Sequence, residues 1–124
     1  METAFIAELF DFQKLEVYKK AQRFHVNCKA LLKDIQAERH VNDQLNRASY
    51  SIVLNIAECS GRTSAADRRN FFTISRASVF ECVAIIDILF LEKKIDKDTC
   101  QCHLQLASEI SRMLYVMIRN LKSQ

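Results

Sequence analysis

Hydrophobic residues recur along the chain at intervals of three and four positions, which is the period of an amphipathic α-helix. This spacing predicts a first helix over residues 12–35 and a second over residues 43–60. The second stripe stops at Gly61, a natural end for a helix. The first stripe consists of Val17, Ala21, Phe24, Cys28, Leu31 and Ile35, and the second of Leu45, Ala48, Ile52, Asn55 and Cys59.

The second half of the chain predicts two more helices. Ser64 and Asp67 have the spacing of a capping box, in which side chains satisfy free backbone N–H groups at a helix start. A third helix should follow over residues 65–93, and beyond Val79 its hydrophobic residues occupy more than one face, as in a widely buried helix. Asp96 can cap a fourth helix over residues 97–121, whose stripe comprises Ala107, Ile110, Leu114, Met117 and Leu121.

Composition narrows the architecture. The 124 residues include one glycine and no proline, whereas an all-β fold or a phosphate-cradling loop needs repeated turn or glycine positions. Four amphipathic helices with short connections form an up-and-down bundle. We therefore expect an all-α, antiparallel four-helix bundle in which residues 1–124 make a single domain.

Three features favour a soluble, cytoplasmic protein. Residues 1–12 contain acidic residues and neither a basic start nor a small-residue cleavage site, so no secretory signal is expected. The most apolar run, residues 79–91, is short and contains Glu81 and Asp87, so no membrane span is expected. The five cysteines are an odd number, which is typical of free thiols in a reducing compartment.

Metal and catalytic chemistry find little support in the sequence. A di-iron bundle requires Glu-x-x-His pairs, and His25, His40 and His103 have no glutamate three residues earlier. Cys100, Cys102 and His103 offer metal ligands, but a structural zinc site usually takes two separated pairs, so ordinary residues in the first turns of a helix are the favoured interpretation. We expect no catalytic residue, no metal and no cofactor, and therefore no enzyme.

Polar side chains interrupt the apolar stripes of the second and third helices. Charged groups in such places should be paired, because an isolated buried charge is costly. The favoured interpretation is a structural network that fixes the register of helices or subunits, and the alternative is a pocket for an anion or another ligand. The proposed network consists of Asn55, Glu58, Arg76 and Glu81, with Arg62 beside it.

Basic residues form one group on the first helix and another around the start of the third. The formal net charge of +3 is too small to indicate nucleic acid by itself, and in one subunit such residues often belong to a solvated helix face. Copies repeated around a ring add their fields and bind multivalently. We therefore assign phosphate contacts with RNA or DNA to Lys14, Lys19, Lys20, Arg23, Arg62, Arg68 and Arg69.

Three segments resemble a known family. They are residues 12–21 (FQKLEVYKKA), 47–62 (RASYSIVLNIAECSGR) and 67–81 (DRRNFFTISRASVFE), and they resemble the four-helix-bundle family of ribosomal-RNA intervening-sequence proteins. That family includes the accessory variability determinant proteins of diversity-generating retroelements. The chain departs from the usual pattern at Cys59 and Ala77, where glycine is common, and at Ser75, where alanine is common.

The resemblance implies four antiparallel helices assembled into a homopentameric barrel with a positively charged surface. In the retroelement branch it also implies binding to a reverse transcriptase and to nucleic acid, and it implies no catalytic residues. The leading hypothesis is thus a homopentamer that binds RNA or DNA and docks a reverse transcriptase. The alternative is a structural oligomer that recognises only a protein partner.

Overall fold

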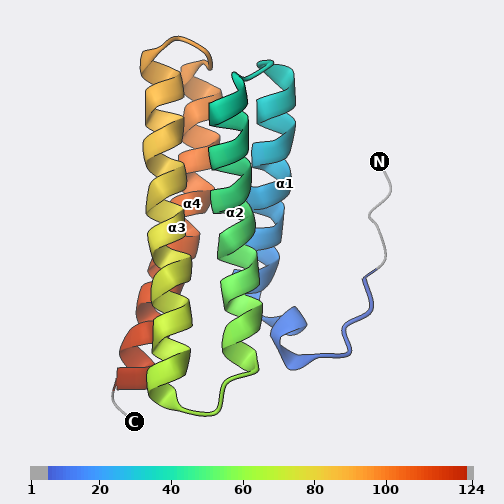
Figure 1. The fold of residues 1–124 in the computed structure, drawn as a ribbon, viewed down its shortest axis with the longest axis vertical. Coiled ribbons are helices and arrows are strands. Elements are labelled where there is room, and N and C mark those ends of the chain that lie inside the picture. Colours follow the sequence, from blue (N-terminus) through green and yellow to red (C-terminus); the bar gives the residue numbers. More distant parts are fainter. Residues whose placement is uncertain (1–5, 123–124) are drawn as a thin grey trace.

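The computed structural model describes residues 6–122 and consists there of four α-helices and one short 3₁₀ helix (Figure 1). The elements are η1 (Asp11–Lys14), α1 (Glu16–Asp34), α2 (Arg39–Ser60), α3 (Ala65–Leu91) and α4 (Lys97–Lys122). Successive helices run antiparallel, α1 and α3 each pack against both α2 and α4, and the described chain contains no strand. The predicted all-helical four-helix fold is confirmed. Residues 1–5, which belong to the segment considered as a leader, and residues 123–124 lie outside the described part.

The core lies between the four helices and is built from the predicted stripes. Each helix contributes large side chains with no exposed surface, among them Phe24 of α1, Ile52 of α2, Ile86 of α3 and Leu114 of α4. Truncating one such side chain to alanine costs about 2–5 kcal/mol, because the lost contacts leave a cavity. The period of three and four residues thus fixes which face of every helix turns inward.

Three helix ends differ from the prediction by two residues or more. Residues 12–15 are not the start of α1, because residues 11–14 form the separate helix η1. The Gln13 side chain of η1 accepts N–H bonds from Leu9 and Phe10, both at 3.0 Å. Helix α2 begins at Arg39 instead of residue 43, after α1 is ended by Gln36 in a left-handed conformation. Helix α3 stops at Leu91 instead of residue 93, because Lys93 has a positive φ and belongs to the loop.

Two predicted caps are present. The Ser64 hydroxyl accepts the Asp67 N–H at 3.0 Å at the start of α3, and the Asp96 carboxylate accepts the Thr99 N–H at 2.8 Å before α4. These side chains satisfy backbone donors that have no partner inside the helix. Within residues 6–122, no helix combines the length and apolar character needed to cross a membrane.

Candidate nucleic-acid interface

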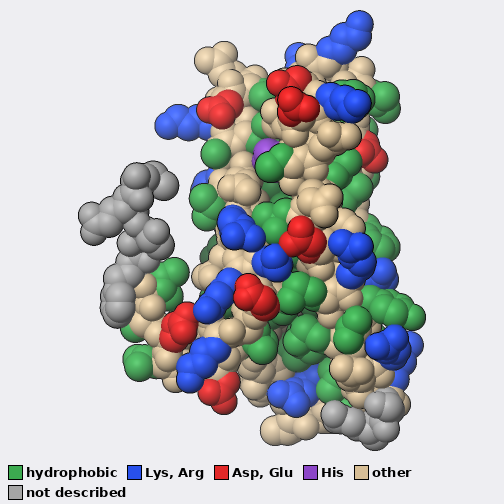
Figure 2. Space-filling model, turned by 180° about the vertical axis from the view of Figure 1, so that it is seen from behind, with side chains coloured by type: hydrophobic (Ala, Val, Ile, Leu, Met, Phe, Trp, Pro, Cys, Tyr) green, Lys and Arg blue, Asp and Glu red, His purple; other side chains and the backbone are tan. Residues whose placement is uncertain are grey.

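Lys19, Lys20 and Arg23 lie on α1, as predicted for the first basic group. Lys14, predicted on the same helix, instead ends the preceding η1. Lys14, Lys19 and Arg23 are exposed, and Lys20 is half-buried at the boundary between α1 and α4. Figure 2 shows Lys and Arg side chains gathered over the rear face of the bundle, with acidic side chains among them. Arg112 of α4, which the sequence analysis did not single out, is exposed on the same side.

Two of these cations already have carboxylate partners. The Lys19 ammonium lies 3.1 Å from Glu8 in an exposed pair, and the Lys20 ammonium lies 2.8 Å from Glu109 in a more shielded one. The hydrogen bond and charge of Lys20, with Arg112 as a smaller cause, lower the pKa of Glu109. An exposed pair is worth little, so a phosphate group can displace Glu8 from Lys19 more readily than Glu109 from Lys20.

The second predicted basic group is engaged in contacts that support the fold. Arg69 donates from Nη1 to the Leu121 carbonyl at 3.3 Å, which caps the last turn of α4. Arg62 lies 3.7 Å from Glu58, and its guanidinium carbon lies 4.6 Å from the centroid of the Phe71 ring. These contacts leave less of the group available for phosphate than the sequence pattern indicates.

Arg68 lies deeper at the same end of the bundle. Its Nε is enclosed and has no hydrogen-bond partner within the described chain, while its backbone carbonyl accepts the Cys59 thiol at 3.6 Å. Arg68 and Leu15 line one hollow of about 300 Å³, so the starts of α1 and α3 lie at the same end of the bundle. The structure therefore brings the beginnings of the two predicted basic groups to one end of the bundle.

The four residues of the predicted polar network take separate partners. Asn55 donates to the carbonyl and hydroxyl of Ser51, at 2.9 and 3.0 Å, within α2. Glu58 of α2 pairs with Arg62 just beyond the end of that helix, and Glu81 of α3 lies 3.2 Å from Arg47 of α2. Contacts between helices are thus made at several points, and no single connected cluster joins the four in the described residues.

Two of the hydrogen bonds between α2 and α3 come from serines that the sequence analysis did not assign to the polar network. The Ser78 hydroxyl donates to the Ser51 hydroxyl at 3.0 Å, and the buried Ser75 donates to the Ile52 carbonyl at 2.9 Å. Each lies on the inward side of its helix, where small polar residues fit between closely packed backbones. Their only sequence signal is the departure at Ser75 from the alanine that is common in the resembling family.

Arg76 joins α3 to α4. Its Nε donates to the Ser111 carbonyl at 3.2 Å, and its guanidinium carbon lies 4.8 Å from the Phe80 centroid and 5.3 Å from the Tyr115 centroid. The guanidinium carbon of Arg119 lies 6.0 Å from the centroid of the same Tyr115 ring. The sequence analysis overlooked both aromatic residues and Arg119, although Arg–aromatic pairs four residues apart are a readable helical signal.

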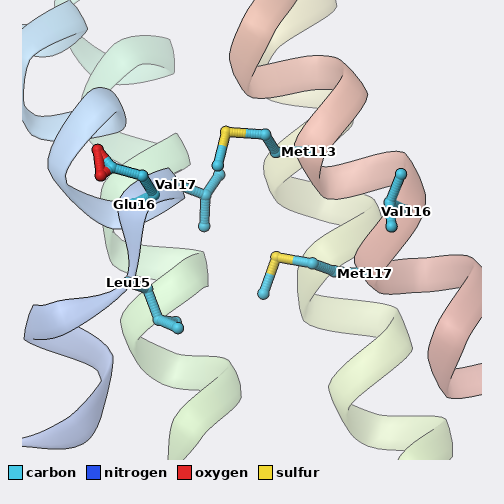
Figure 3. A pocket seen from close by; sticks show the side chains of 6 residues that line it. All are labelled: Leu15, Glu16, Val17, Met113, Val116 and Met117. Carbon is cyan, nitrogen blue, oxygen red and sulfur yellow. The ribbon is translucent and has the colours of Figure 1, made fainter.

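An apolar groove opens between the start of α1 and the end of α4. It has a volume of about 400 Å³. Figure 3 shows Met113 and Met117 reaching from α4 toward Val17 and Leu15, with the Glu16 carboxylate turned away from them. With no polar side chain directed into it, the groove has no acid, base or nucleophile for catalysis.

Buried thiols and the imidazole of His103 contribute to packing and to contacts between helices. Among the described residues, no cluster of three or more His, Cys, Asp or Glu side chains is suited to hold a metal ion. Burial raises the pKa of Cys28, with Cys82 as a second cause, and raises the pKa of Cys82 itself to about 12. His103 bridges α4 and α1 through the carbonyls of Thr99 and Asn27, at 2.8 and 3.4 Å.

Comparison with known proteins gives a consistent assignment. The sequence profile of the 23S rRNA-intervening sequence proteins matches residues 13–116. Among solved structures, a protein of unknown function from the S23 ribosomal protein family of Bacteroides thetaiotaomicron is similar to this chain, with 26% identity and a TM-score of 0.76. The similarity covers 82% of this chain and 97% of that one. The curated proteins compared with the chain give no significant match.

Proposed function

The chain belongs to the 23S rRNA-intervening sequence protein family, and from this premise we propose that it is a cytoplasmic, non-enzymatic, homopentameric accessory factor that binds RNA or DNA. The observation that carries the proposal is the exposure of Lys14, Lys19 and Arg23 on η1 and α1, together with Arg112 of α4, whose charge acts on Glu109, the partner of Lys20. Phosphate contacts of this kind give affinity without reading sequence.

One subunit alone would bind weakly. Its α1 side offers only a few cations, and the Lys20 charge is largely balanced by Glu109 at 2.8 Å. Repeating this surface around a ring lets a single nucleic acid touch several copies, so each further contact becomes intramolecular. The proposal therefore joins nucleic-acid binding to assembly, and neither part is expected to work well without the other.

Assembly is supported by an apolar surface on the outward side of α2 and α3. Leu54, Ile74, Ile88 and Leu91 are exposed there, Leu91 to 77%. Apolar surface extending along a helix pair in this way is typical of a subunit contact. We infer that the subunits of the homopentamer meet through this face, which leaves the basic side on α1 and α4 open.

The test combines size-exclusion chromatography and light scattering with charge reversal. We would measure the molar mass alone, with a structured RNA and with a duplex DNA, at low and near-physiological salt. The variant Lys19→Glu with Arg23→Glu should keep the pentamer mass and lose binding about tenfold or more. The slope of log affinity against log salt should shrink by roughly 0.9 for each lost contact with duplex DNA.

The matched control reverses two exposed lysines at the opposite end of the bundle, Lys33→Glu with Lys94→Glu. This variant has the same net charge as the first, so it should retain most of the wild-type affinity if position matters. Equal losses of affinity in both variants would show that binding depends on net charge and not on position. A pentamer that binds no nucleic acid even at low salt would contradict the proposal.

A second candidate is a structural oligomer that recognises only a protein, which the apolar α2 and α3 surface favours on its own. It predicts oligomers whose mass never shifts with nucleic acid.

On the family resemblance we also propose a reverse transcriptase as the protein partner of the nucleic-acid-binding factor. Co-purification of the two proteins from a co-expressing cell, with and without nuclease treatment, would show whether they touch directly.

A further inference from the structure

Aromatic rings and guanidinium groups alternate along the face formed by α3 and α4. The order is Phe80, Arg76, Tyr115 and Arg119, with guanidinium-to-ring distances of 4.8, 5.3 and 6.0 Å. The positions come in two pairs, each four residues apart on one helix, so both helices contribute one cation and one ring. We call these four residues the α3–α4 ladder.

The ladder is anchored yet open. The hydrogen bond from Arg76 Nε to the Ser111 carbonyl, at 3.2 Å, holds the central guanidinium in place. Phe80 and Tyr115 nevertheless remain 53% and 51% exposed. Each ring therefore keeps exposed surface on which a flat ligand can stack.

A hollow of about 280 Å³ continues from the ladder along the same two helices. Phe80 belongs to both, and Val83, Leu104 and Ala107 make the hollow mostly apolar. Its polar lining includes Arg112. The face thus combines flat apolar surface with three arginines.

The charge of this face suits a polyanion. Arg76, Arg112 and Arg119 lie along it, while Glu109 of α4 is paired with Lys20 on the α1 side. A strip of stacking surface bordered by cations is the arrangement by which proteins hold unpaired nucleotides. A duplex hides the faces of its bases, so exposed rings add little to duplex binding.

We propose that the α3–α4 ladder binds unpaired nucleotides of single-stranded RNA or DNA. Bases stack on Tyr115 and Phe80, and the phosphates meet the three neighbouring arginines. The inference rests on the proposed nucleic-acid binding and specifies the form of nucleic acid that this second surface accepts. The basic side of α1 needs only phosphates and does not distinguish single strands from duplexes.

The experiment measures the affinity of the intact oligomer for three labelled ligands by fluorescence anisotropy. They are a short oligothymidylate, an abasic strand with the same number of phosphates, and a duplex. Tyr115→Leu should weaken oligothymidylate binding about fivefold or more and leave the abasic and duplex affinities within about twofold. Tyr50→Leu is the matched control, because Tyr50 is 52% exposed on α2, away from the ladder.

A second variant gives a direct signal of stacking. The chain has no tryptophan, so Phe80→Trp introduces a single reporter while keeping an aromatic surface. Its fluorescence should be quenched by oligothymidylate and hardly changed by the abasic strand. Absence of this difference would contradict base stacking at the ladder.

Other outcomes would also overturn the inference. An unchanged oligothymidylate affinity in Tyr115→Leu, or an equal loss for all three ligands, would show that the ring does not stack on bases. A smaller molar mass for this variant would assign the ladder to a subunit contact. A wild-type protein that binds no nucleic acid would overturn the proposed function as well. If binding still depends on Lys19 and Arg23, only the inference about the ladder is wrong.

Discussion

The buried hydroxyl of Ser75 allows the α2–α3 contact to be measured as a free energy. Ser75 has no exposed surface and donates to the Ile52 carbonyl at 2.9 Å. Ser75→Ala removes this donor, but the carbonyl lies inside α2 and keeps the N–H bond of its own helix. No buried group loses its last partner, so the expected loss is the net value of one hydrogen bond, about 1 kcal/mol.

The substitution also changes helix propensity, which must be separated from the hydrogen bond. Alanine is a better helix former than serine by roughly 0.5 kcal/mol, so Ser75→Ala should lower the free energy of unfolding by only about 0.5 kcal/mol. Ser108→Ala is the control, because Ser108 is exposed within α4. It should raise that free energy by roughly 0.5 kcal/mol.

Guanidinium denaturation at one fixed protein concentration measures both variants. The denaturation midpoints should move in opposite directions with unchanged slopes, which indicates a change in stability and not in the denatured state. The two free energies should differ by about 1 kcal/mol. If Ser75→Ala were as stabilising as Ser108→Ala, the hydroxyl would contribute nothing and the reasoning would be refuted.

Three further predictions concern other described contacts. Arg69→Met should lower the free energy of unfolding by about 1 kcal/mol and speed amide exchange near Leu121, whose carbonyl accepts the arginine at 3.3 Å. Burial, and less strongly Lys29, lowers the pKa of His25 from 6.5, so the unfolded chain takes up the proton first. Stability should fall as the pH drops below 6.5 and level off beneath the folded pKa, and denaturation of His25→Gln across this range should not show that step. Cys102 is exposed, unlike the other four cysteines, so maleimide should label it first. Mass spectrometry should show this rapid labelling in the wild type and only slow labelling in Cys102→Ser.

Hydrophobic periodicity predicted the middles of the helices better than their ends. The stripes through Phe24 and Ile52 are buried except at Ile35 and Asn55, which are partly exposed, because a helix must turn its apolar side inward. The start of α2 at Arg39 was missed because most residues of its first turn are exposed and polar. Val41 was the available signal, since it packs against the core and lies four residues before Leu45. The 3₁₀ turn before α1 depends on hydrogen bonds of Gln13 that no spacing rule indicates.

The candidate site was less predictable because its properties depend on partners from distant positions. Arg68 and Arg69 are neighbours with the same charge, yet one is partly enclosed and the other reaches the end of α4 at Leu121. Sequence shows that a residue is basic and on which side of its helix it lies. It does not show that Lys20 meets Glu109 at 2.8 Å, and this pairing decides how much charge remains for phosphate.

The proposed closed ring requires two different contact patches on each subunit, so one apolar patch is not enough. In a closed ring each subunit joins two different patches, whereas a two-fold dimer needs only one self-complementary patch. The outward side of α2 and α3 supplies one, with Ile88 and Leu91 exposed. Residues 6–10, the described segment before η1, lead away from the bundle in Figure 1 and supply a second patch, with Leu9 and Phe10 exposed to 84% and 64%.

We therefore expect the segment before η1 to contact the α2 and α3 face of the neighbouring subunit. Leu9→Glu with Phe10→Glu should break the ring into monomers, because the charges oppose burial of that segment. Val26→Glu is the control, since Val26 is also an exposed apolar residue but lies on α1. Light scattering that finds an unchanged pentamer in the double variant would assign the second patch elsewhere, and a stable dimer in the wild type would mean that the α2 and α3 face pairs with itself.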